Sequence, residues 1–323
     1  MSVDNLPMAI KPESKLLLAC TNEIETILIS VALSQCLETP LVRLFMSHLG
    51  LGRLSNVPVF RQGKTPTVLI GFPTPRLAQD EEAARKVLKL GLDLTWISEH
   101  PLDADEIAAA PRLRLEPVDQ GLWQTVCRVL GCPRSAIEPF AGIAAELGEP
   151  LVDPQVADHD TAWRYCLEAA CQEPQYLGPS SAGLISGLQP DPILVLAGHQ
   201  LIVQRSQLAA DSSFHTFDTP NGRAVLVLAP RRALGFYYGL AHEVRRRRSC
   251  VLSVLAFDTG EPLIVEYEQR PSDFKLRMEM IGSRFPEHVV RPYGPSGIAI
   301  KGSKAGSLDV LDPLIELLSS EIN

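Results

Sequence analysis

The sequence predicts a two-domain α/β protein whose first domain is a doubly wound, mainly parallel sheet. At 323 residues the chain is long for one hydrophobic core and suits two domains of ordinary size. Three short apolar runs, 16–19, 67–70 and 94–97, alternate with helical stretches through residues 15–150. Continuous apolar runs are typical of strands buried on both faces, so a parallel sheet covered by helices is expected. A smaller α/β domain is expected to follow, with a cleft between the two.

Each of the three buried strands ends in residues that could form a site. The first strand runs into residues 20–25 and then into a helix over 26–33. The second ends at Gly71, and a helix over 75–90 leads to the third, which ends at residues 98–100. Because ligands of open α/β sheets bind at the carboxyl ends of the strands, these three positions are the first candidates for a functional site.

A stretch rich in glycine, proline and serine, 178–192, predicts the connection between the domains. The expected division is therefore a first domain over 1–180, a linker over 181–191 and a second domain over 192–323. In the second domain we expect strands over 222–228, 250–257 and 262–267, with a helix over 234–248 before the second of them.

The residues at the end of the third strand, Ser98-Glu99-His100-Pro101, resemble the Asp-His-His-Pro signature of the DHH phosphoesterase family. The order of elements also resembles that family over nearly the whole chain, including its DHH-associated C-terminal domain, although no motif is intact. The resemblance implies a site in which several carboxylates and histidines hold two divalent metals over a scissile phosphate. Such a site must bring many hard ligands around two cations.

The chain departs from that pattern at most ligand positions. Glu23 and Glu25 fall on the positions of two acids in the first motif, each with one extra methylene. Gly71 replaces the Asp that, in the family, bridges the two metals. The resemblance therefore implies a remnant site, in which Glu23, Glu25, Glu99 and His100 are the candidate metal ligands. The full set of remnant positions is Glu23, Glu25, Gly71, Ser98, Glu99, His100 and Asp158.

Structural roles compete with these assignments. Glu23 and Glu25 are also typical of acids at a helix N-terminus, where the helix dipole favours negative charge, and His100 could be a hydrogen-bonded structural histidine. Asp158 or Asp160 could cap the helix that begins near residue 161, and capping is favoured over metal ligation there.

The second candidate region is the segment that replaces the glycine-rich terminal loop of the family. It contains His288, Arg291 and Gly294. The resemblance implies that this segment closes over the ligand, and arginine can meet a phosphate with two parallel hydrogen bonds. We therefore expect His288, Arg291 and Gly294 to bind the ligand.

Other patterns favour ordinary structure. The basic run 245–248 ends a helix, where cations offset the dipole, and is expected to be a solvated helix end. The seven cysteines include no Cys-x-x-Cys pair and are expected to be reduced and buried. A net charge of −8 gives no general attraction to nucleic acid. No apolar run approaches the roughly 18 residues that span a bilayer, and the N-terminus lacks a basic leader, so cytoplasmic residence without membrane contact is expected.

These observations favour a catalytically degenerate DHH-like protein that binds a phosphate-containing ligand or acts as a scaffold. The ligand could be a nucleotide, a short oligonucleotide or a polyphosphate, and one divalent cation, Mn²⁺ or Mg²⁺, could accompany it. A protein partner or a second copy of the chain is also left open. Two alternatives remain: a divergent metal-dependent phosphoesterase, and an unrelated nucleotide-binding α/β protein.

Overall fold

The computed structural model divides the chain into two compact units, unit 1 over Met1–Leu201 and unit 2 over Ile202–Asn323. The structure describes most of the chain. The described residues are 15–46, 48–61, 65–72, 81–90, 93–98, 107–108, 110, 112–118, 121–145, 147, 150–229, 237–257, 263–268, 271–293, 296–301 and 310–320.

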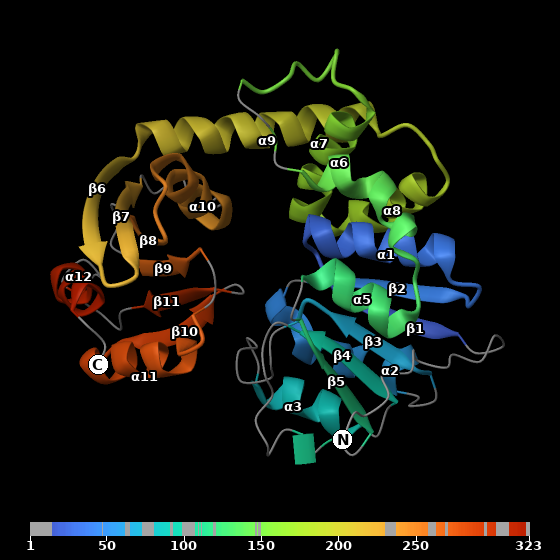
Figure 1. The fold of residues 1–323 in the computed structure, drawn as a ribbon, viewed down its shortest axis with the longest axis horizontal. Helices are drawn as coiled ribbons and strands as arrows, with labels where there is room; N and C mark the ends of the chain where they lie inside the picture. The colour runs from blue at the N-terminus through green and yellow to red at the C-terminus, as the bar shows by residue number, and fades with distance from the viewer. Residues whose placement is uncertain are drawn as a thin grey trace. The chain divides into compact units, whose positions relative to one another are not determined.

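Unit 1 is built on a five-stranded parallel sheet with the strand order β2-β1-β3-β4-β5 (Figure 1). The strands are β1 Leu16–Thr21, β2 Leu41–Met46, β3 Thr67–Ile70, β4 Leu94–Ser98 and β5 Leu113–Pro117. The three apolar runs of the sequence are β1, β3 and β4, and each is buried along its length. The predicted α/β class and parallel sheet are confirmed.

Helices cover both faces of this sheet because alternate strand residues point to opposite sides. One face packs against η1 (His48–Asn56), α2 (Pro58–Arg61) and α3 (Glu81–Lys89). The other packs against α1 (Ile24–Cys36) and α5 (Leu122–Leu130). Of the helix predicted over 75–90, residues 75–80 lie outside the described residues.

A further layer of helices packs on the outer side of α1 (Figure 1). Its helices are η3 Arg134–Ala136, η4 Glu138–Phe140, α6 Ala141–Ala144, α7 His159–Gln172, η5 Pro174–Tyr176 and α8 Leu177–Ile185. The N-terminal half of α9 (Pro192–Asp211) joins this layer because Gly198 lies against the backbone of Tyr165 in α7.

The boundary between the units differs from the linker expected over 181–191. Residues 181–185 belong to α8, which packs on α1 and α7, and the division falls inside α9, after Leu201. Proline explains the difference, since its missing N–H costs nothing in the first turn of a helix. Pro179 lies in the first turn of α8, and Pro192 is the first residue of α9.

Unit 2 is a six-stranded mixed sheet with the order β10-β11-β9-β8-β7-β6. Its strands are β6 Ser213–Thr219, β7 Gly222–Ala229, β8 Leu252–Phe257, β9 Leu263–Tyr267, β10 Val289–Tyr293 and β11 Gly297–Lys301. One face packs against α11 (Phe274–Arg284) and α12 (Leu311–Ser319). The other packs against α10 (Tyr237–Arg248) and the C-terminal end of α9.

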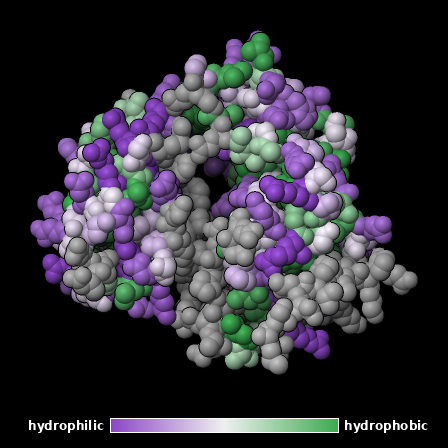
Figure 2. Space-filling view, in the orientation of Figure 1, coloured by the Kyte–Doolittle hydropathy of each residue, from purple (hydrophilic) through white to green (hydrophobic). Residues whose placement is uncertain are grey.

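The surface drawn in Figure 2 is mainly hydrophilic, with small separate hydrophobic areas. Val156, before α7, and Ile193, at the start of α9, are among the exposed apolar side chains. Within the described part of the chain, no helix has the length and apolar character needed to cross a membrane.

Candidate functional site

The strand order of unit 1 places a topological switch point between β1 and β3, because the chain runs outward to β2 on one side of β1 and to β3 on the other. Open α/β sheets bind ligands at such a point, outside the carboxyl ends of the strands. Here β1 ends at Thr21 and continues through Asn22 and Glu23 into α1, while β3 is followed by Gly71 and Phe72. The sequence-predicted positions Glu23 and Gly71 therefore both lie at the switch point.

The hydroxyl groups of Thr21 and Thr26 lie at this switch point. The Oγ1 atom of Thr26 donates to the backbone oxygen of Thr21 at 2.6 Å and is 2.9 Å from that of Glu23, while Thr21 Oγ1 lies 3.1 Å from Thr26 Oγ1. Both threonines are completely buried. Their hydroxyls are satisfied by the chain itself, which locks the turn between β1 and α1.

Gly71 packs directly on this pair. Its φ of +79° lies in the left-handed region that favours glycine. A Cβ atom added at Gly71 would lie 2.6 Å from Thr21 Oγ1 and 3.0 Å from Thr26 Cγ2. The position that the DHH resemblance gives to a metal-bridging carboxylate therefore has no room for any side chain while Thr21 and Thr26 keep their places.

Ser98, at the end of β4, also has a structural role. Its Oγ atom donates to the backbone oxygen of Phe72 at 3.0 Å, and the Nε1 atom of Trp96 donates to the same oxygen at 3.1 Å. Ser98 is only 2% exposed. The two donors hold the loop after β3 against β4, so Ser98 fixes backbone rather than facing a ligand.

Glu23 and Glu25 flank the start of α1. Glu23 is the N-cap residue and its side chain does not cap the helix, while Glu25 is an exposed acid in the first turn. Negative charge there is favoured by the helix dipole. Asn22, beside them, donates from Nδ2 to the backbone oxygen of Cys171 at 3.2 Å and so joins this turn to α7.

Glu99 and His100, the two remaining candidate metal ligands, lie outside the described residues. Among the residues that are described, no group of three or more histidine, cysteine, aspartate or glutamate side chains is placed to hold a metal ion.

Asp158 is a helix cap, as favoured from the sequence. Its Oδ1 atom accepts a hydrogen bond from the backbone N–H of Thr161 at 2.8 Å, at the start of α7. This backbone hydrogen bond lowers the pKa of the Asp158 carboxyl, because it stabilises the charged form. His159 and Asp160 form an exposed pair with 3.3 Å between Nδ1 and Oδ1.

The C-terminal candidates lie in unit 2. His288 precedes β10, is half-buried, and packs edge-on against the ring of Phe285 with 6.1 Å between the centroids. Arg291 pairs with Ala299 through the backbone of β10 and β11, and its side chain lies outside the described residues, as does Gly294. Their role in binding a ligand stays a prediction.

The basic run at the end of α10 is only in part the solvated helix end that was expected, because Arg247 and Arg248 are exposed whereas Arg245 is buried. Arg245 is 5% exposed and faces Glu266 of β9. Arg247 pairs with Glu243 and donates to Ser206, and the guanidinium of Arg248 lies 3.7 Å from the ring centre of Phe214. These three cations are therefore engaged within unit 2.

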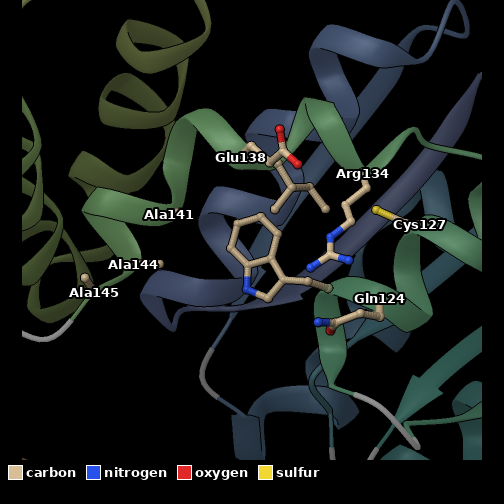
Figure 3. Close-up of a pocket in the computed structure, with 9 residues that line it drawn as sticks. Gln124, Cys127, Arg134, Glu138, Ala141, Ala144 and Ala145 are labelled. Atoms are coloured by element: carbon tan, nitrogen blue, oxygen red, sulfur yellow. The ribbon is translucent and has the colours of Figure 1, made fainter.

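A pocket of about 540 Å³ lies elsewhere in unit 1, at a place that the sequence pattern does not indicate. Figure 3 shows Gln124 and Cys127 on α5 facing Arg134, Glu138 and Ala141 on the segment that follows. The complete lining is Trp123, Gln124, Cys127, Arg134, Ile137, Glu138, Ala141, Ala144 and Ala145. The pocket is formed by contacts between short helices, which residue spacing alone does not reveal.

Comparison with known proteins gives weak likenesses. No family model and no curated protein matches the chain. The crystal structure of an uncharacterized protein from Helicobacter pylori G27 aligns over 95% of this chain and 100% of its own, with 10% identity and a TM-score of 0.29. That of a putative family II inorganic pyrophosphatase from Methanococcus jannaschii has the same coverage, 14% identity and a TM-score of 0.27. At these TM-scores neither likeness assigns the chain to a family.

Proposed function

We propose that this chain is a catalytically inactive DHH-like protein that binds a phosphate-containing ligand at the β1/β3 switch point. The contact between Gly71 and Thr21 carries the proposal. A two-metal phosphoesterase needs an anionic bridge between its cations, and the threonine pair occupies the space that this side chain would need. Thr21 and Thr26 therefore fill the space of the catalytic side chain, and the residue at that position, Gly71, has no carboxylate.

The parallel sheet supports a binding role at the same place. With the strand order β2-β1-β3-β4-β5, the loops after β1 and β3 diverge at the carboxyl ends of these two strands. Open α/β sheets bind ligands at this place. Glu23 and Glu25 bring negative charge to this turn, so a bound phosphate needs cationic donors from other segments. Arg291 and His288 are the phosphate-binding residues that we expect from the sequence.

The catalytic part of the proposal is tested by hydrolysis of pyrophosphate and of a simple phosphodiester in Mn²⁺, with and without Glu23→Gln and His100→Ala. No Mn²⁺-dependent rate above background is expected from the wild type. A robust rate abolished by His100→Ala, but kept in the exposed control Glu279→Gln, would establish the divergent phosphoesterase instead.

The binding part is tested by titrating mononucleotides and short oligonucleotides into wild type, Arg291→Ala and the control Arg284→Ala, at low and moderate salt. Loss of a charge-assisted contact to phosphate should weaken binding about tenfold to a hundredfold. Arg284, an exposed residue at the end of α11, should matter little. Equal affinities for all three proteins would remove Arg291 from the site, and no binding by the wild type would refute the ligand proposal.

A further inference from the structure

Three cysteines of unit 1 lie in or against one hydrophobic cluster, and one of them lines the pocket. Cys36 is the last residue of α1, Cys127 lies in the last turn of α5, and Cys132 follows α5 by two residues. Cys132 belongs to the hydrophobic cluster against which Cys36 and Cys127 both pack, and its thiol donates to the backbone oxygen of Pro133 at 3.8 Å. All three cysteines are free thiols in the structure.

The local chain dictates the contact between Cys127 and Cys132. Gly131 adopts the left-handed conformation, with φ of +69°, and its N–H donates to the backbone oxygen of Cys127. The N–H of Cys132 donates to the same oxygen at 3.1 Å. When a helix ends in a left-handed glycine, the residue after the glycine contacts the residue four positions before the glycine. Here both of those positions are cysteine, so the helix end itself brings the two thiols together.

The two thiols differ in their access to solvent. Cys127 is half-buried and lines the pocket, where Figure 3 shows it on the α5 side opposite Arg134. Cys132 is only 6% exposed and lies behind it. A small oxidant entering the pocket therefore meets Cys127 first, and Cys132 is the thiol that the end of α5 places beside it.

We propose that Cys127 and Cys132 are a redox modification site that a hydroperoxide oxidises to a reversible intramolecular disulfide. The thiolate of Cys127 attacks one peroxide oxygen, the O–O bond breaks, and Cys127 becomes a sulfenic acid while the other oxygen leaves as water or alcohol. Cys132 then attacks the Cys127 sulfur, the S–O bond breaks, and the hydroxyl leaves as water with the remaining thiol proton. The two sulfurs lose two electrons and the peroxide gains them.

The surroundings set the pH dependence of this reaction. Burial raises the pKa of the thiols of Cys127 and Cys132, so both are protonated at neutral pH. Because the thiolate is the nucleophile, the oxidation rate should rise with pH between pH 7 and 9. Reduction by dithiothreitol should restore both thiols.

The test treats reduced full-length protein with hydrogen peroxide, counts free thiols, and maps peptides without reduction. The expected product retains five of its seven thiols and carries a bond between Cys127 and Cys132. Fluorescence should change as well, because Trp123 lines the same pocket one helical turn before Cys127.

Single serine variants separate the roles of the thiols. Cys132→Ser should stop at the sulfenic acid, which dimedone traps on Cys127, whereas Cys36→Ser should still form the bond. Cys171→Ser, a half-buried helical thiol in α7, is the matched control and should behave as wild type. Peptide mapping of the wild type decides the proposal even if a variant fails to fold. Retention of all seven thiols, or a bond that uses Cys36 or links two molecules, would overturn it.

Discussion

The Nη1 atom of Arg245 lies 3.8 Å from the Oε1 atom of Glu266 inside unit 2, yet the pKa of the Glu266 carboxyl is raised to about 7. Burial raises this pKa, and the guanidinium only partly offsets the effect. The two side chains are 6% and 15% exposed, and the Oε2 atom of Glu266 has no hydrogen-bond partner. The attraction between the two charges is therefore smaller than the free-energy cost of removing the Glu266 carboxylate from water.

Unit 2 should lose stability as the pH rises through the titration of Glu266. The folded state holds this proton up to about pH 7, whereas the unfolded chain releases it near 4.5, so between these values the folded state binds more protons. Relative to Glu266→Gln, the wild type should lose on the order of 2–3 kcal/mol between pH 4.5 and 8.

Amide hydrogen exchange in β8 and β9 measures this difference in unit 2. Tryptophan fluorescence does not, because Trp96, Trp123 and Trp163 all lie in unit 1. A constant difference between the two proteins across this pH range would show that Glu266 does not titrate as expected.

Replacing Arg245 by methionine should destabilise unit 2 in a pH-dependent way. At pH 8 the change removes the cation that lowers the pKa of Glu266, so the carboxyl takes up a proton, and the extra cost relative to pH 5 should be about 1.4 kcal/mol. At pH 5 Glu266 is already protonated, so this extra cost is absent. Hydrogen exchange of the same strands at both pH values measures the effect, and the double variant Arg245→Met/Glu266→Leu should recover most of the loss. Equal costs at the two pH values would contradict this account.

Gly71→Ala should destabilise unit 1 more than a comparable change at Gly187. Both glycines have a positive φ, +79° and +64°, so alanine at either position should cost about 1 kcal/mol of backbone strain. At Gly187 the new methyl group meets open space, whereas at Gly71 it meets Thr21. The added clash should bring the cost at Gly71 to about 2–4 kcal/mol.

Urea unfolding followed by tryptophan fluorescence compares the two glycine variants within unit 1. Equal losses would show that the turn after β3 accommodates a side chain, and would remove the main support for the inactive site.

Gly198→Ala should separate α9 from α7. A Cβ atom at Gly198 would lie 1.8 Å from the backbone oxygen of Tyr165, which cannot rotate away. We expect a loss of about 1–3 kcal/mol in the stability of unit 1. Gly178→Ala, in α8 with nothing within 4 Å of the added carbon, is the control and should be neutral or slightly stabilising. Thermal unfolding of both variants, monitored by tryptophan fluorescence, distinguishes the two effects.

The sequence predicted the features that depend on local hydrophobicity. The runs 16–19, 67–70 and 94–97 are β1, β3 and β4 because a strand buried on both faces must be apolar throughout. The cap at Asp158 was also predictable, since a short acid before a helix accepts from its first N–H groups.

Features that depend on distant contacts were not predicted. Arg245 reads as an exposed helix end until its partner, Glu266, is known from the packing of β9 on α10. The segment 178–192 has the composition of a linker, since it is rich in glycine, proline and serine. Proline is also common in the first turn of a helix, and Pro179 and Pro192 lie in the first turns of α8 and α9. The thiol pair did leave a local signal, a glycine directly before Cys132 and four residues after Cys127, which is the spacing of a helix ending.

The contact between Thr21 and Gly71 also constrains the order in which mutations can accumulate. A side chain gained at residue 71 meets the buried hydroxyl of Thr21, and a smaller residue at 21 removes a hydroxyl on which the turn into α1 depends. Each single step is costly, and only both together give room for an acid beside the switch point. Stepwise substitution from this pair of residues to a carboxylate at position 71 therefore passes through a less stable single variant.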